Sequence, residues 1–217
     1  MTKFRAVIFD LDGTLVETER LVVTAALSAM RHLGLPERAD LFEHLVGTVD
    51  QEEQVFSMAF GAAFDPVAFN AAWAAEVEAA FTNGIDLRPG VVDLLDRLDS
   101  LRLPFALATN SRTDSAHRTL KQAGIHHRFD PLHIHGRDRV DRPKPAPDLY
   151  LHAAAILGID PALCIAFEDS TPGAQAALAA GMTVVHIPDQ QRLAPGLGVH
   201  VQAASLLEGA RALGLLS

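Results

Sequence analysis

Short apolar runs recur along the chain, and each ends in a cluster of carboxyl or hydroxyl side chains before a helix-like pattern begins. Alternation of this kind is typical of buried parallel strands that are joined by helices. Four runs are clear and a fifth is weaker; they are residues 6–9, 105–108, 164–167 and 183–187, with 132–135 as the weaker one. The sequence therefore predicts an α/β fold, a doubly wound parallel sheet with right-handed crossovers.

Residues 16–85 interrupt this alternation. They are rich in Ala, Leu, Phe and Glu at helical spacing and contain no convincing strand, so we expect a helical insertion. Because the insertion follows the first strand directly, it would project from the edge where ligands of open α/β sheets bind. The prediction is an α/β core of residues 1–15 and 86–217, with a helical cap of residues 16–85 that acts as a lid.

Composition excludes some function classes. The 217 residues carry a formal net charge of -9, and no block of Lys and Arg could follow a nucleic-acid backbone or an anionic membrane. We therefore expect neither nucleic acid nor a membrane as a partner. A surplus of carboxylates repels phosphorylated molecules, so any phosphate site in this chain must supply its own positive charge.

Cysteine use and the N-terminus bear on location. Cys164 is the only cysteine, so no disulfide can form within the chain, which is compatible with a reducing compartment. The apolar run that follows the N-terminus is interrupted by Asp10 and is too short for a signal peptide or a membrane span. We expect a cytoplasmic protein.

Carboxylates gather at the predicted ends of two strands. Asp10 and Asp12 follow the first strand, and Glu168 and Asp169 follow the run 164–167. An Asp-x-Asp pair alone is common after a strand, but converging carboxylates are costly unless a cation neutralises them. Mg²⁺ prefers carboxylate, carbonyl and water oxygens and also binds substrate phosphate. The pattern therefore favours a magnesium site.

Two further clusters could bind a phosphate group. Thr109, Asn110, Ser111 and Arg112 end the second strand and open a helix, so hydroxyls, backbone N–H groups and the helix dipole could bind a phosphate oxygen together. Lys144, one of three lysines, is bracketed by prolines that restrict the backbone around it. Such a lysine could pair with a nucleophilic carboxylate and a phosphoryl group. Taken alone, the first cluster is better explained as an ordinary helix cap, and Lys144 as a solvated surface lysine.

These four clusters, in this order, resemble the haloacid dehalogenase-like hydrolase superfamily over essentially the whole chain. The motifs are residues 9–14, residues 109–110, Lys144-Pro145-x-Pro147 and residues 167–170. Their spacing and the early helical insertion are similar to the branch that contains β-phosphoglucomutase and many phosphatases of sugars and small metabolites. The resemblance implies a Rossmann-like core with an inserted cap.

The resemblance also implies roles for these residues. Asp10 would attack phosphorus and form an aspartyl-phosphate, and Asp12 would protonate the leaving oxygen and then activate water. Mg²⁺ would be held by the Asp10 carboxylate, the backbone carbonyl of Asp12 and Asp169, with Glu168 nearby or ligating directly. Lys144 and Thr109 would hold the phosphoryl oxygens as charge develops.

The cap supplies the remaining candidates for substrate contact. We expect Glu19 and Gly47 to contact the substrate; Thr18, Arg20, Thr48 and Glu53 are further candidates. Some of the polar residues at positions 17–20 would face the substrate when the lid closes. No motif in the cap identifies the leaving group of the substrate.

Three other function classes are weighed against a phosphatase. Haloacid dehalogenases attack carbon without Mg²⁺ and need no second carboxylate, so Asp12 favours phosphorus chemistry. β-Phosphoglucomutase uses cationic cap residues, whereas Val22 and Val49 stand here at its histidine and arginine positions and residues 16–85 contain no lysine. Losing these cations should weaken a mutase. A binding protein that kept only the fold is less favoured, because the four key motif residues are all present.

The resulting prediction is a magnesium-dependent phosphatase that acts on a small phosphorylated metabolite, with the mutase as the alternative. We expect a monomer or a weak homo-oligomer.

Overall fold

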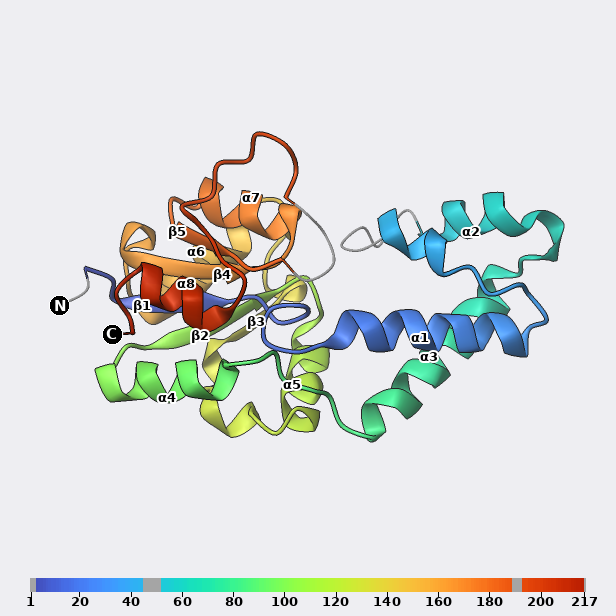
Figure 1. Ribbon diagram of the computed structural model, residues 1–217, viewed down its shortest axis with the longest axis horizontal. Coiled ribbons are helices and arrows are strands. Elements are labelled where there is room, and N and C mark those ends of the chain that lie inside the picture. Colours follow the sequence, from blue (N-terminus) through green and yellow to red (C-terminus); the bar gives the residue numbers. More distant parts are fainter. Residues whose placement is uncertain (1–2, 45–51, 189–192, 217) are drawn as a thin grey trace. The chain divides into compact units, whose positions relative to one another are not determined.

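The computed structural model describes residues 3–44, 52–188 and 193–216. The chain divides into two compact units. Met1–Val16 together with Asp86–Ser217 form the first, which we call the core unit, and Glu17–Ile85 form the second, the helical unit (Figure 1).

The core unit contains a six-stranded sheet in which every neighbouring pair of strands is parallel. The strands, in the order β3-β2-β1-β4-β5-β6, are β1 (Ala6–Phe9), β2 (Phe105–Thr109), β3 (Ile134–Gly136), β4 (Cys164–Glu168), β5 (Thr183–His186) and β6 (Val201–Gln202). This is the order of a doubly wound Rossmann-like sheet, and the predicted fold class is confirmed.

Two details of the sheet differ from the sequence prediction. The weaker run begins its strand only at Ile134, because Asp130 accepts a hydrogen bond from the Leu132 N–H and starts a 3₁₀ turn there. β6 was not predicted, since a strand of two residues leaves no periodic pattern.

Helices cover both faces of the sheet. They are α4 (Val91–Leu101), α5 (Thr113–Gln122), α6 (Asp148–Leu157), α7 (Thr171–Ala179) and α8 (Leu206–Ala212) (Figure 1). On one face, α6 and α7 pack on alternate strand residues, many of which are alanines that let the helices approach closely. On the other, α8 packs at Gly209, where an added Cβ would lie 2.4 Å from Val185 Cγ1.

Aromatic side chains fill the second face. Phe9 stacks on Phe167 with ring centroids 5.4 Å apart and meets Phe105 edge to face at 6.4 Å. The three rings lie in the adjacent strands β2, β1 and β4. Phe9 and Phe167 directly precede Asp10 and Glu168, and Phe105 begins the strand that ends at Thr109. Their packing therefore fixes the strand ends that carry the clusters.

The strands β1 and β4 are neighbours although two other strands separate them in the sequence. β2 and β3 lie on one side of β1, and β4, β5 and β6 lie on the other, so the strand order reverses direction at β1. Ligands of such sheets bind at this reversal, beyond the carboxyl ends of the strands. The register pairs Phe9 with Phe167, so Asp10 and Glu168 follow at the same edge.

The helical unit is built around aromatic residues. Its helices are α1 (Thr18–His32), a 3₁₀ segment (Ala39–His44), α2 (Glu52–Phe60), a second 3₁₀ turn (Gly61–Ala63) and α3 (Pro66–Thr82). Phe56 and Phe69 are fully buried, and the Trp73 indole N–H donates to the Val22 carbonyl of α1 at 3.0 Å. These aromatic residues form the core of the unit.

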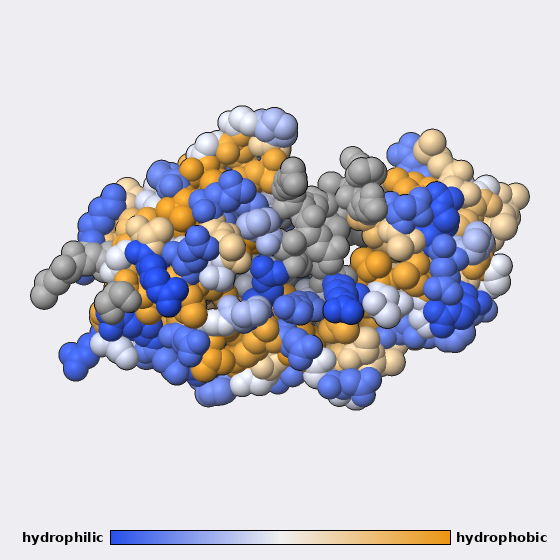
Figure 2. Space-filling view, viewed as in Figure 1, coloured by the Kyte–Doolittle hydropathy of each residue, from blue (hydrophilic) through white to orange (hydrophobic). Residues whose placement is uncertain are grey.

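On the face drawn in Figure 2, hydrophilic and hydrophobic residues are interspersed over each unit. Among the described helices, none is by itself long and apolar enough to cross a membrane. Only the pair Glu53–Ala63 and Pro66–Thr82, bent by 117°, reaches that length and composition when the two are taken together.

Candidate active site

Lys144 joins two carboxylates at the reversal of the sheet. Its Nζ lies 2.6 Å from Oδ1 of Asp10 and 2.5 Å from Oε1 of Glu168. All three residues are buried, with exposed fractions of 7%, 7% and 0% for Lys144, Asp10 and Glu168. If all three groups are ionised, one ammonium group between two buried carboxylates leaves the cluster with excess negative charge.

The loop that carries Lys144 is braced against the end of β2. The Asn110 side chain donates from Nδ2 to the Lys144 carbonyl at 3.2 Å and accepts the Lys144 N–H on Oδ1 at 3.0 Å. The peptide bond between Lys144 and Pro145 is cis. Through these two hydrogen bonds, Asn110 fixes the backbone from which the Lys144 side chain extends.

Asp12 lies beside the hydroxyl cluster that ends β2. Ser111 Oγ donates to Asp12 Oδ2 at 2.8 Å, and the Ser111 N–H donates to Thr109 Oγ1 at 3.0 Å. Thr109 is buried, whereas Asp12 and Ser111 are half-buried. The sequence places these groups 99 residues apart, and the parallel pairing of β1 with β2 brings them together. Arg112 is exposed and occupies the N-cap position of α5, where its side chain makes no capping hydrogen bond.

Asp169 is enclosed by the turn that follows β1. Thr14 Oγ1 donates to Asp169 Oδ1 at 3.2 Å. Gly13 has a φ of +80°, and a Cβ at this position would lie 2.2 Å from Asp169 Oδ2. Glycine is therefore required here both for its backbone conformation and for the close approach of the carboxylate.

Three buried carboxylates could hold a metal ion. Asp10, Glu168 and Asp169 each offer an oxygen, and these oxygens all lie within 4.8 Å of one another. Carboxylates at such separations repel unless a cation lies among them, and oxygen ligands suit hard divalent cations. The residues present therefore fit a divalent metal.

Gly173 makes room for the Glu168 carboxylate. A Cβ at Gly173 would lie 1.9 Å from Glu168 Oε1, and the first turn of α7 therefore packs directly on this side chain. Ser170, the N-cap of α7, donates from Oγ to Glu168 Oε2 at 3.1 Å. Both Glu168 oxygens thus have protein partners.

The electrostatics of the cluster disfavour a charge on Asp10 in the absence of a metal. Burial raises the pKa of Asp10 to about 8; Lys144 opposes this shift, and the carboxylates of Glu168 and Asp12 add to it. Burial alone would lower the pKa of Lys144, but attraction by Asp10 and Glu168 outweighs it and raises the pKa. A divalent cation among these carboxylates would stabilise the Asp10 anion.

Tyr150 belongs to the site although the sequence did not identify it. Its hydroxyl donates to Glu168 Oε1 at 2.6 Å, and its ring lies 5.0 Å from Lys144 Nζ. Burial, followed by the charge of Glu168, raises the pKa of Tyr150 well above its ordinary value. A signal was present, because a tyrosine hydroxyl on an apolar helix face requires a partner when buried.

The structure does not test two of the predicted substrate contacts. Glu19 lies in α1 of the helical unit. Gly47 lies outside the described residues. Their proposed contacts with a substrate stay predictions.

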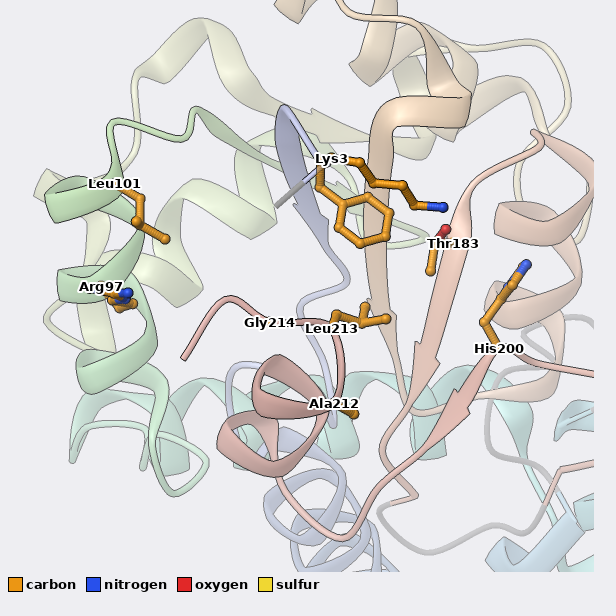
Figure 3. A pocket seen from close by; sticks show the side chains of 9 residues that line it. Lys3, Arg97, Leu101, Thr183, His200, Ala212, Leu213 and Gly214 are labelled. Carbon is orange, nitrogen blue, oxygen red and sulfur yellow. The ribbon is translucent and has the colours of Figure 1, made fainter. Parts of the chain in front are cut away.

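A pocket of about 710 Å³ lies elsewhere on the core unit (Figure 3). It is lined by Phe4, which precedes β1, by Thr183 at the start of β5, and by Arg97 of α4. These positions are at the edge where the strands begin, whereas the carboxylates follow the strand ends. The chemistry of the side chains, and not the size of this pocket, identifies the candidate active site.

Comparisons with known proteins agree with this geometry. Residues 4–181 match the family model described as haloacid dehalogenase-like hydrolase. The chain is 33% identical over 181 residues to hexitol phosphatase A of Escherichia coli, covering 83% of this chain and 81% of that protein. It is 31% identical over 182 residues to a phosphorylated carbohydrates phosphatase of Thermotoga maritima, covering 83% of each.

Solved structures show the same fold. A putative β-phosphoglucomutase from Thermotoga maritima superimposes with a TM-score of 0.84 and is 26% identical. The match covers 99% of this chain and 100% of that one. The resemblance to the family inferred from the four motifs is confirmed.

Proposed function

Because the chain belongs to the haloacid dehalogenase-like hydrolases, we propose that it is a magnesium-dependent phosphatase of a small phosphorylated metabolite, such as a sugar phosphate. The observation that carries the proposal is the contact of Lys144 with Asp10 and Glu168, beside Asp169. A buried lysine among three carboxylates provides a nucleophile, a cation for the phosphoryl group and ligands for a metal. The two phosphatases to which the chain is similar support this choice of substrate class.

In the first chemical step, a carboxylate oxygen of Asp10 attacks phosphorus. The new O–P bond forms as the bond to the metabolite oxygen breaks, which gives an aspartyl-phosphate. Lys144 holds Asp10 Oδ1 and so orients the carboxylate. Its ammonium group also lies where it can stabilise negative charge on the transferring phosphoryl oxygens.

Asp12 acts as the general acid in the first step and as the general base in the second. It donates a proton to the leaving oxygen of the metabolite and then accepts one from the water that attacks the aspartyl-phosphate. Hydrolysis releases inorganic phosphate and restores the Asp10 carboxylate. The hydrogen bond from Ser111 orients Asp12 for this role. The Thr109 hydroxyl accepts the Ser111 N–H and can donate its own proton to a phosphoryl oxygen.

A divalent cation would be held by Asp10 and Asp169, with the backbone carbonyl of Asp12 and with Glu168 adjacent. When bound, Mg²⁺ neutralises phosphate charge and lowers the repulsion between the nucleophile and the phosphate dianion. The protein contributes a buried, preformed set of oxygens to this centre.

A phosphosugar mutase is the alternative. The likeness to a putative β-phosphoglucomutase favours it, and both activities use the same core chemistry. Against it, the helical unit carries Val22 at the position of the mutase histidine, and the Val22 carbonyl accepts the Trp73 N–H within the unit's own core. The position of the mutase arginine, Val49, lies outside the described residues.

One experiment separates these classes. The purified protein is incubated with Mg²⁺ and a panel of phosphorylated metabolites that includes β-glucose 1-phosphate, and both inorganic phosphate and isomerised product are measured. Release of phosphate that EDTA abolishes supports the phosphatase. Formation of glucose 6-phosphate with little phosphate release would replace it with the mutase. Absence of turnover, with no phosphorylated Asp10 after acetyl phosphate treatment, would leave a binding protein.

A further inference from the structure

His186 is a buried titratable residue that the proposed chemistry does not use. It is the last residue of β5 and is 0% exposed. Its Nε2 lies 2.8 Å from the backbone carbonyl oxygen of Asp169. Because a carbonyl oxygen can only accept a hydrogen bond, the Nε2 atom must carry the proton. This contact fixes the tautomer of the ring.

The other ring nitrogen of His186, Nδ1, is buried and makes no hydrogen bond among the described residues. A buried acceptor without a partner costs free energy. The two preceding strand residues, Val184 and Val185, are apolar and buried, and an apolar side chain at position 186 would avoid that cost. Packing therefore does not explain the histidine, whereas its N–H donation to Asp169 does.

The hydrogen bond from His186 to the Asp169 carbonyl lies one residue beyond the last paired residue of β4. The carbonyl of Phe167 accepts the Asp10 N–H at 3.0 Å, and that of Glu168 accepts the Ile187 N–H at 2.7 Å. The ladder between β4 and β5 ends at the pairing of Glu168 with His186. The His186 side chain then reaches the next carbonyl, that of Asp169, beyond the last strand pair.

We propose that His186 is a positioning residue for the metal centre: its N–H fixes the Asp169 peptide and thereby directs the Asp169 carboxylate towards Asp10 and Glu168. The inference rests on the proposed metal-dependent function and deepens it. Thr14 holds the same residue at its carboxylate, so Asp169 is fixed at two points, one on the main chain and one on the side chain.

The test replaces His186 by phenylalanine, which keeps an aromatic ring in the buried space and removes the N–H. Mg²⁺ binding to the substrate-free protein is measured by calorimetric titration, so the result does not depend on turnover. We expect the dissociation constant to rise about tenfold, since partners that orient metal ligands typically contribute at least that much. His186→Gln, which retains an N–H donor, should recover part of the loss.

His135→Phe is the matched control. His135 is also a buried strand histidine, 3% exposed, with a ring nitrogen that has no partner among the described residues, but it lies in β3. We expect its Mg²⁺ affinity to equal that of the wild type. Thermal unfolding of each variant shows which are folded, and His186→Leu, which also lacks the N–H and matches the apolar residues before it in β5, serves if His186→Phe is not folded.

The outcomes separate this inference from the proposed function. Wild-type affinity in a folded variant that lacks the N–H, His186→Phe or His186→Leu, or an equal loss in His135→Phe, would overturn the positioning role alone. A wild-type protein that binds no Mg²⁺ would overturn the proposed metal-dependent function together with it. A loss confined to the His186 variants supports the inference.

Discussion

Tyr150 and Lys144 contact the same carboxylate oxygen, Oε1 of Glu168, from α6 and from the loop that precedes it. The hydroxyl donates at 2.6 Å, and the ammonium lies 5.0 Å from the centroid of the tyrosine ring. The oxygen is therefore held by two donors, one neutral and one charged. This arrangement fixes Glu168 and, through the shared lysine, Asp10.

Lys144→Met should damage both stability and activity. Methionine keeps the chain length but leaves two buried carboxylates without their cation, which typically costs about 3–5 kcal/mol when one partner of a buried pair is removed. Urea unfolding measures this loss without Mg²⁺, and added Mg²⁺ should restore part of it by neutralising the same carboxylates. A loss of stability equal with and without Mg²⁺ would separate the lysine from the metal centre.

Asp10→Asn should abolish turnover while the protein stays folded. The amide has nearly the shape of the carboxylate but is not a comparable nucleophile, so kcat should fall at least about 10³-fold, in the range seen when a nucleophile is removed. The measurement is phosphate release at saturating substrate, with circular dichroism as the control for folding. Full activity in this variant would disprove the proposed mechanism.

Asp12→Ala should separate the two chemical steps. Loss of the general acid and base stops net hydrolysis, since typical contributions of such groups are about 10²–10⁴-fold. Acetyl phosphate has a leaving group that needs little protonation, so it should still phosphorylate Asp10. Mass spectrometry should then detect an accumulated phosphoenzyme. Undiminished hydrolysis would assign the proton transfers to another group.

The structure also shows which parts of the site can be predicted from sequence. Asp10, Lys144 and Asp169 stand out because charged residues interrupt an apolar run or a proline-rich segment, which local patterns make visible. Tyr150 was missed because its position matches the apolar face of α6, and only the fold shows that its hydroxyl meets Glu168. His186 was missed because it continues the apolar run of β5 and bonds a main-chain oxygen of another strand.

Gly173→Ala should disrupt the site through Glu168. The added methyl would lie 1.9 Å from Glu168 Oε1 and would displace the carboxylate from Lys144, Tyr150 and Ser170. We expect weaker Mg²⁺ binding, and a loss of stability within the range of about 1–3 kcal/mol typical of overpacking. Gly198→Ala is the matched control, because an added Cβ there has no atom within 4 Å. Equal behaviour of the two variants would contradict the prediction.

The buried His135 should make stability depend on pH. Burial, followed by repulsion from His152, lowers the pKa of His135 from 6.5 to about 4. Above pH 6.5 the His135 ring is neutral in both the folded and the unfolded protein, so it does not change stability. As the pH falls below 6.5 the ring binds a proton in the unfolded protein, whereas in the folded protein it stays neutral down to about pH 4. Stability should therefore fall across this window, by about 2 kcal/mol between pH 7 and pH 5.

Urea unfolding of the wild type and of His135→Phe at pH 7 and pH 5 isolates this contribution, because phenylalanine cannot bind a proton. The difference in unfolding free energy between the two pH values should be about 2 kcal/mol smaller in the variant, whatever its absolute stability. An unchanged slope in His135→Phe would mean that another group takes up the proton on unfolding.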